Sequence, residues 1–258
     1  MRVWAHYRSA FKTFWLPPRS SQQEWLDAED LAGPDLGENL QDLRWLNRYL
    51  GSHWIARTAV HRLWRAAGSP RQWSLLDVGT GVGDIPEVVL RWGQQHGVEV
   101  SSVALDNHRG VLQCRQTSPS QTLPIAFVQG DGLCLPFQPR TFDVVVCSTM
   151  LHHLEWHEGI ILLREMARLA RHGIVVNDLV RGRVHYLAAR LFLPLVTRNR
   201  LTRHDGPLSV LRAYSVDEVR TMAGLAGLAQ VRVRMMCGYR LLLMATMPGA
   251  APKASDGS

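Results

Sequence analysis

The chain contains 258 residues, of which 46% are hydrophobic and 20% are charged. This composition is that of a soluble globular protein with a substantial core, and no apolar run reaches the ~20 residues that a membrane-spanning helix needs. The formal net charge of +7 raises the question of nucleic-acid binding. However, Lys occurs only at Lys12 and Lys253 and no run of five basic residues is present, so we do not expect nucleic acid as the main partner.

The four cysteines indicate neither a disulfide framework nor a metal centre. Cys114, Cys134, Cys147 and Cys237 form no Cys-x-x-Cys pair and have no histidine at metal-ligand spacing. Cys147 lies in an apolar run and is expected in the core. Because no secretory signal is evident either, we predict a cytoplasmic protein without a bound metal.

The first 15 residues have the pattern of an amphipathic helix. Aromatic residues at positions 4, 7, 11 and 14/15 alternate with basic ones, including Arg2, Arg8 and Lys12. Such a helix can lie on a membrane surface or close as a lid over a ligand site. We favour the lid, since no second anchoring signal is visible.

A second helical region follows a break at Leu16-Pro17-Pro18 and a polar, linker-like stretch. Apolar residues at helical spacing predict helix over residues 39–67, interrupted at Gly51. Residues 1–70 are therefore expected to form an N-terminal helical cap or lid.

The most informative stretch lies at residues 75–86. An apolar run ends at Asp77, and three glycines then alternate at Gly79, Gly81 and Gly83 before Asp84. This pattern predicts a buried parallel strand and a tight turn that leads into a helix. Carboxylates facing the turn suit a cationic ligand and repel the pyrophosphate of a dinucleotide.

The pattern D-x-G-T-G-x-G-D closely resembles motif I of class I S-adenosylmethionine (SAM) methyltransferases. A glycine turn without function in an α/β fold is the alternative. The resemblance implies a SAM cofactor, with S-adenosylhomocysteine (SAH) as product. It also implies cofactor contacts at this turn, at Asp77, Gly79, Thr80, Gly81, Gly83 and Asp84.

Two further acids follow predicted strands of the same sheet. Residues 98–105 read as a strand that ends at Asp106, and residues 125–128 as one followed by Asp131. In the family that the motif resembles, these positions contact the ribose and the adenine. We therefore add Asp106, Asn107, Asp131 and Gly132 to the implied cofactor site; helix capping by Asp106 is the alternative.

The strand predicted at residues 142–147 leads into Ser148-Thr149-Met150-Leu151-His152-His153. The Asn/Asp-Pro-Pro-aromatic motif of methyltransferases that modify base amino groups is absent. The Leu-His-His-Leu form resembles quinone-biosynthesis and natural-product methyltransferases. Ser148 and His153 are implied cofactor contacts, His152 a substrate contact, and His153 a catalytic base or a pocket residue. Because adjacent side chains diverge, we expect at most one of these histidines to face the substrate.

After a helix over 158–169 and a strand over 172–176, the segment between Leu179 and His204 contains six arginines and no acid. Pro194 is expected to kink or divide a helix here. The segment resembles a bacterial group of small-molecule methyltransferases found in polyketide and phenolic-lipid pathways. It implies either a substrate pocket or an Arg–Asp network, with candidate residues Arg181, His185, Tyr186, His204 and Arg212. His204, next to Asp205, is a second candidate base.

The alternation of strands and helices predicts an α/β fold: a Rossmann-like, seven-stranded, mostly parallel sheet with helices on both faces. Strands over 230–235 and 239–247 would form a closing antiparallel hairpin after a helix capped by Ser215. We expect a cap or lid at 1–70, a SAM-binding core at 71–180 and a substrate-pocket insertion at 181–214. Residues 215–248 would complete the core, and 249–258 would be a disordered tail.

These features favour a bacterial methyltransferase that modifies a small, largely apolar phenol, quinol or polyketide-like acceptor, on oxygen rather than carbon. A SAM-fold protein that does not methylate, such as a SAM-containing cyclase, is the alternative, and nucleic-acid methylation rests only on the charge. The expected partner is a small molecule; the oligomeric state is open.

Overall fold

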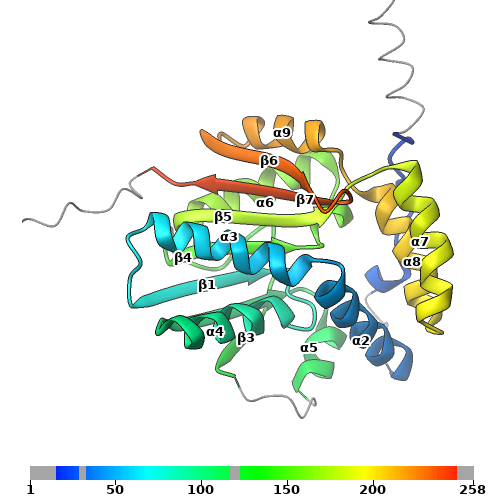
Figure 1. Cartoon of the computed structure of the whole chain (residues 1–258), viewed down its shortest axis with the longest axis horizontal. Helices are drawn as coiled ribbons and strands as arrows, with labels where there is room; N and C mark the ends of the chain where they lie inside the picture. Colours follow the sequence, from blue (N-terminus) through cyan, green and yellow to red (C-terminus); the bar gives the residue numbers. More distant parts are fainter. Residues whose placement is uncertain (1–15, 29–32, 117–122, 249–258) are drawn as a thin grey trace, which may run out of the picture.

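The computed structural model describes residues 16–28, 33–116 and 123–248 (Figure 1). The amphipathic segment expected at 1–15 and the tail expected at 249–258 lie outside the described residues. No described helix is long and apolar enough to cross a lipid bilayer.

A seven-stranded sheet in the order β3-β2-β1-β4-β5-β7-β6 forms the centre of the molecule. Strands β1 to β5 are parallel, and β7 runs antiparallel to both β5 and β6. The strand bounds are β1 Gln72–Val78, β2 Glu99–Asp106, β3 Ile125–Gln129, β4 Phe142–Ser148, β5 Ala170–Leu179, β6 Gln230–Met236 and β7 Arg240–Thr246. The predicted sheet and its closing hairpin are confirmed. The strand order reverses between β1 and β4, where sheets of this type bind ligands beyond the carboxyl ends of the strands.

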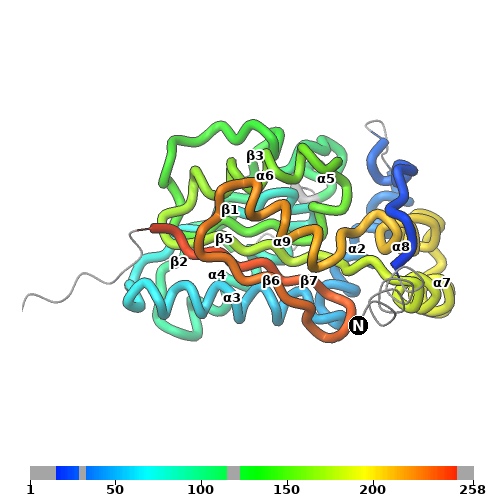
Figure 2. Tube along the Cα trace, turned by 90° about the horizontal axis from the view of Figure 1, so that it is seen from above, coloured from blue at the N-terminus to red at the C-terminus, as the bar shows by residue number. Residues whose placement is uncertain are grey.

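Helices cover both faces of this sheet. Their bounds are α2 Pro34–Tyr49, α3 Ser52–Ala66, α4 Asp84–His96, α5 Arg109–Gln116, α6 Trp156–Leu169, α7 Arg183–Val196, α8 Arg200–Arg212 and α9 Val216–Leu225, with short 3-10 turns η1 Trp25–Asp27 and η2 Leu151–His153. Helices α3 and α4 pack on one face and α6 and α9 on the other, while α7 and α8 lie together at one end (Figures 1 and 2).

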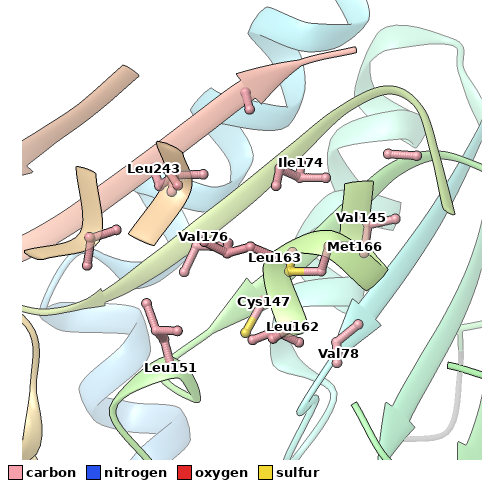
Figure 3. Close-up of a cluster of buried hydrophobic side chains, with 14 of the residues drawn as sticks. Val78, Val145, Cys147, Leu151, Leu162, Leu163, Met166, Ile174, Val176 and Leu243 are labelled. Carbon is pink, nitrogen blue, oxygen red and sulfur yellow. The ribbon is translucent and has the colours of Figure 1, made fainter. Parts of the chain in front are cut away.

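The strands supply alternate residues to two cores, because successive side chains of a strand point to opposite faces. In β4, Val144 and Val146 pack with α3 and α4, whereas Val145 and Cys147 pack with α6. Figure 3 shows this second core around Cys147, which is fully buried as predicted. The buried strands thus hold the carboxyl edge of the sheet rigidly, as a precise ligand site requires.

Several elements differ from the sequence-based expectation. Helix α3, expected within a separate cap, packs against the sheet and α4, so this helix contributes a layer of the core. Pro194 does not divide α7, because it lies in the last turn, where few following amides depend on its position. Residues 200–212, which gave no helical pattern, form α8 despite the internal Pro207. At Gly206 a Cβ would lie 2.2 Å from Leu193 Cδ1, so this glycine permits α7 to pack closely on α8.

Candidate active site

The glycine turn has the left-handed backbone conformation that its glycines permit. Gly79, Gly81 and Gly83 have φ values of +67°, +53° and +69°, a region that favours glycine. The amides of Gly79 and Thr80 donate to Leu105 O at 2.9 and 3.0 Å, which binds the turn to the end of β2. A Cβ at Gly79 would lie 2.6 Å from Met150 Sδ, so the turn also packs directly against the exit of β4.

Asp77 is a buried acid with one free oxygen. Thr80 Oγ1 donates to Asp77 Oδ2 at 2.6 Å, while Oδ1 is buried without a hydrogen-bond partner among the described residues. Burial raises the pKa of Asp77 to about 8, and the charges of Asp84 and Asp106 act in the same direction against the Thr80 hydrogen bond. A buried carboxyl group with a spare oxygen fits a cationic amino group, which would compensate its desolvation.

Asp84 connects the same turn to the N-terminal helices. Its Oδ2 accepts a hydrogen bond from Asn47 Nδ2 at 3.0 Å and lies 2.7 Å from His53 Nε2. Asn47 is in α2 and His53 in α3, so both helices are attached to the first turn of α4 by one carboxylate. The side chain of Asp84 is thus bound within the protein and supports the turn.

The other implied cofactor residues follow β2, β3 and β4. Asp106 Oδ2 accepts from Gly81 N at 2.8 Å and its Oδ1 from His108 N at 2.9 Å, which joins the second acid to the glycine turn. Asp131 is exposed and Oδ1 accepts from Leu133 N. Asn107 is exposed, and a Cβ at Gly132 would lie 2.9 Å from Met150 Cε. These groups therefore gather at the carboxyl ends of β1, β2 and β3.

Ser148 differs from these residues. Its hydroxyl is buried and lies 3.0 Å from Ser52 Oγ, and it accepts a hydrogen bond from Asn177 Nδ2 at 2.9 Å. The side chain therefore links β4 to α3 and β5, which makes it a structural residue rather than a free ligand contact.

Residues 16–28, which we call the strap, cross this edge of the sheet. Arg19 Nη2 donates to the carbonyls of His152 and Leu154, and its guanidinium lies 4.4 Å from the centre of the Tyr214 ring. At the other end, Ala28 O lies 3.1 Å from His108 Nε2, two residues after Asp106. The strap thus runs from the β4 exit to the β2 exit. The sequence indicated only a polar linker here.

The paired histidines share one direction, which corrects the expectation that they diverge. His152 Nδ1 lies 2.6 Å from Asp178 Oδ1, and His153 Nδ1 lies 2.7 Å from Asp27 Oδ1. Their Nε2 atoms lie 3.7 and 3.9 Å from the carboxylate oxygens of Glu24. The 3-10 turn η2 brings the two rings to a centroid distance of 4.3 Å, so both reach the strap.

Acidic neighbours control the charge of His153. Burial opposes protonation of His153, but the carboxylates of Glu24, Asp27 and Asp178 raise its pKa to about 9. His153 is therefore a cation at neutral pH. It is also the more accessible of the two, with 22% of its side chain exposed against 4% for His152.

Glu24, His152 and His153 offer three ligand atoms within 4.8 Å of one another, the number that a divalent metal site needs. Arg212 Nε lies 3.8 Å from Glu24 Oε1, and Ser209 Oγ donates to Oε2. The Arg212 charge opposes a divalent cation at the same carboxylate. The cluster is therefore better suited to a polar organic group, which could donate a hydrogen bond to Glu24 Oε1. This oxygen accepts no hydrogen bond from a described residue.

The backbone before the pair is strained. Thr149 has φ +51°, which a β-branched residue rarely adopts and which costs about 1–3 kcal/mol. Thr149 N donates to Asn177 O, which holds this conformation, and Met150 then lies against the glycine turn. Strain of this kind concentrates at functional sites.

The remaining substrate candidates do not form one set. Arg181 donates to Pro17 O, Ala213 O and Glu218 Oε1, and Arg212 donates to the carbonyls of Gln22, His152 and His153. His185 Nδ1 lies 2.9 Å from Val180 O, in the connection between β5 and α7, and Tyr186 is half-buried in α7. Both arginines use their donors within the protein, so they hold the strap and α8 in place.

His204, the second candidate base, lies beside the strap. Its ring stacks on Trp25 at 3.7 Å, and its Nδ1 lies 2.7 Å from Asp205 Oδ1. The same Asp205 carboxylate accepts the amides of Trp25 and Leu26. His204 and Asp205 therefore position η1, which carries Asp27 and follows Glu24.

Sequence reasoning did not single out Glu24, Asp27 or the pairing of Asp178 with His152. The only local signal in the strap is Glu24 three residues before Asp27, which form a reciprocal capping box around η1. That pattern predicts a turn, and it carries no information about the distant histidines.

Comparisons with known proteins identify a methyltransferase domain in this chain. The family described as "Methyltransferase domain" matches residues 75–173, from within β1 to within β5. The chain is 29% identical over 153 residues to norajmaline N-methyltransferase of Rauvolfia serpentina, a match that covers 56% of this chain and 50% of that protein. It is 33% identical over 102 residues to demethylmenaquinone methyltransferase of Deinococcus radiodurans, covering 36% of this chain and 40% of that protein. The chain thus spans about half the length of the curated relatives it matches.

Solved structures show the same fold at low sequence identity. A SAM-dependent methyltransferase from Aquifex aeolicus aligns with a TM-score of 0.56 and 17% identity, over 82% of this chain and 98% of that one. Human N-acetylserotonin methyltransferase aligns with a TM-score of 0.59 and 14% identity, over 95% of this chain and 66% of that one. The chain therefore has the fold of these SAM-dependent methyltransferases. Its residues 75–173 match the methyltransferase-domain family.

Proposed function

We propose that the protein transfers a methyl group from SAM to an ionisable oxygen of a small, largely apolar phenol, quinol or polyketide-like acceptor. The observation that carries the proposal is the position of Met150. Its side chain packs against Gly79 and Gly132 of the cofactor edge, by which we mean the implied cofactor residues at the carboxyl ends of β1, β2 and β3. The two residues after Leu151 are the paired histidines under the strap. A methyl donor and a polar acceptor group would thus be neighbours.

The cofactor edge offers a group for each part of SAM. The free Oδ1 of Asp77 suits the amino group, the Asp106 carboxylate suits the ribose hydroxyls, and Asp131 suits the adenine amino group. When bound, SAM supplies a methyl group on an already activated sulfonium. The protein then has to position the acceptor and exclude water.

The histidine pair gives the acceptor side its chemistry. A phenol has a pKa of about 10, so little of it is ionised at neutral pH. The His153 cation would stabilise the phenolate. His152 is oriented by Asp178 through Nδ1, and its Nε2 makes no hydrogen bond with a described residue, so it is the better placed group to accept the phenol proton. In this assignment the base moves from His153 and His204 to His152, and His153 becomes the electrostatic partner.

The names of the relatives support a small-molecule acceptor, since they refer to an alkaloid and to a quinone precursor. Natural-product biosynthesis in a bacterium is the setting that we propose. The non-methylating alternative keeps the cofactor edge and differs only in the reaction.

The direct test combines two measurements. Calorimetry should show SAH binding, and mass spectrometry should show a product heavier by one methyl group when the protein is incubated with SAM and a panel of phenols, quinols, amines and thiols. Product from the phenols and quinols supports the proposal. SAH binding without any product would favour a SAM-fold protein that does not methylate, and a product from amines alone would contradict the assigned acceptor.

Cofactor binding should depend on pH through Asp77. The pKa of its carboxyl group is about 8 in the ligand-free protein, against an ordinary value of 3.8. Because a cationic amino group needs the carboxylate, binding below pH 8 must release a proton, and SAH affinity should fall by up to about tenfold per pH unit as the pH decreases. Calorimetry at pH 6, 7 and 8 measures this, and Asp77→Asn should remove the dependence. Equal affinity at pH 6 and 8 would exclude Asp77 from the amino-group site.

Nucleic-acid binding should be weak. Arg181 and Arg212 are buried and bonded within the protein, so neither is available to phosphates, and the sequence contains no run of five basic residues. We expect duplex DNA to bind less tightly than ~10⁻⁶ M at physiological salt. Fluorescence anisotropy with a labelled duplex measures this, and tighter binding with a steep salt dependence would revive the nucleic-acid alternative.

A further inference from the structure

Helix α7 presents its apolar face to solvent. Val184, Leu187, Leu191 and Leu195 recur at helical spacing, so they form one stripe along the helix. The exposed fractions of these four residues are 55, 53, 71 and 83%. A helix of a globular protein normally turns such a stripe toward the core, and a continuous exposed stripe indicates an interaction surface.

The opposite face attaches α7 to the protein. Leu193 is buried and lies against α8 at Gly206, where a Cβ would come within 2.2 Å of its Cδ1. His185 Nδ1 lies 2.9 Å from Val180 O at the start of the helix. Helix α7 is thus held through a narrow face, as the outer member of the α7–α8 pair at one end of the molecule (Figures 1 and 2).

Positive charge flanks the stripe. Arg183 and Arg190 are exposed on one side of the helix, and Arg198 is exposed just beyond its end. No acid occurs between Leu179 and His204. An exposed apolar stripe bordered by arginines is the arrangement of helices that lie in the interface of anionic membranes.

The positive charge beside the stripe distinguishes between the partners that could cover it. A symmetric contact with a second copy would bring the same arginine-flanked faces together, with no acid on the segment to balance them. Residues 1–15 contain Arg2, Arg8 and Lys12 and no acid, so they are an equally poor electrostatic partner. An anionic lipid bilayer suits both features, because its acyl chains accommodate the apolar stripe and its phosphates bind the arginines.

We propose that α7 binds the surface of an anionic lipid bilayer, with its leucine stripe among the acyl chains and its flanking arginines at the phosphates. Because α7 follows β5 at the carboxyl edge of the sheet, this orientation places the candidate active site beside the bilayer. The inference does not depend on the proposed methyl transfer, since it concerns a surface outside the cofactor edge.

Vesicle co-sedimentation of the full chain tests this. With vesicles of phosphatidylglycerol and phosphatidylcholine we expect binding that weakens with salt, and much weaker binding to phosphatidylcholine alone. The double variant L191Q/L195Q should lose at least tenfold in affinity for these vesicles, because each substitution removes an apolar leucine side chain from the interface. The variant R190Q/R198Q should lose about fivefold per arginine at low salt.

The matched control is L225Q/M235Q. Leu225 and Met235 are each 52% exposed, and they lie on α9 and β6, away from α7. This control should bind vesicles as the unmodified chain does, and circular dichroism should show that all variants remain folded. Normal vesicle binding by L191Q/L195Q would overturn the proposal. So would the absence of vesicle binding together with a dimer, measured by analytical ultracentrifugation, that this variant dissociates.

Discussion

Replacing Asp106 by alanine is expected to weaken SAH binding by about 10- to 150-fold, the equivalent of ~1.5–3 kcal/mol for lost charge-assisted hydrogen bonds. The Asp106 carboxylate is buried at the end of β2, and its two oxygens accept the backbone amides of Gly81 and His108. Its removal would therefore also loosen the glycine turn. Calorimetry with SAH measures the change.

Two variants separate these effects. Asp106→Asn keeps the shape and one acceptor oxygen, so it should retain part of the affinity and most of the turn geometry. Glu99→Ala is the matched control, because Glu99 lies at the other end of the same strand and is exposed. Glu99→Ala should bind SAH normally. An unchanged dissociation constant in Asp106→Ala would remove Asp106 from the cofactor site.

The second large effect is expected from the pair of His152 and Asp178. If His152 accepts the acceptor proton, His152→Ala should lower kcat by ~10²- to 10⁴-fold at saturating SAM while SAH affinity is preserved. Asp178→Asn should lower kcat in the same direction, because it removes the charge that orients His152 Nδ1. The Asn variant keeps the buried shape, so it remains informative if His152→Ala fails to fold. His157→Ala, which alters an exposed histidine of α6, is the control.

A series of phenols of decreasing pKa distinguishes a base from a structural residue. Phenols that are already ionised at the assay pH do not need a base, so the rate deficit of His152→Ala should shrink along the series. His153→Gln should behave differently and weaken the binding of all phenolates, because it removes the charge partner. An equal deficit for every phenol in His152→Ala would show that His152 only shapes the site.

Much of the cofactor edge could be predicted because its signals are local. The apolar run before Asp77 specifies a buried strand, and the glycines at 79, 81 and 83 specify a turn that other residues cannot adopt without strain. Asp106 and Asp131 could be added because parallel strands bring their carboxyl ends to one edge of the sheet. These predictions depend on the apolar pattern of the strands, on the conformational preference of glycine, and on the rule that parallel strands end at one edge of the sheet.

Local signals were insufficient where packing overrides them. The segment after β5 was expected to be kinked or divided at Pro194, and α7 is not divided there because the proline lies near its end. Helix α8 forms across Gly206 and Pro207, where the glycine permits close contact with Leu193 of α7. In both cases a neighbouring element stabilises what the propensity of the segment disfavours.

The sequence by itself determined the class of fold, because strand and helix patterns alternate along the chain. It also determined the glycine turn and the strand-end acids, because each of these is encoded within about ten consecutive residues. Only the tertiary structure decided which groups meet at the acceptor side. Asp27 and His153 are 126 positions apart, and Glu24 and Ser209 are 185 apart. Such contacts form because the strap is held across the strand ends by Arg19, Asp205 and Arg212. No periodic pattern of residues in the sequence can predict a hydrogen bond between segments that are so far apart along the chain.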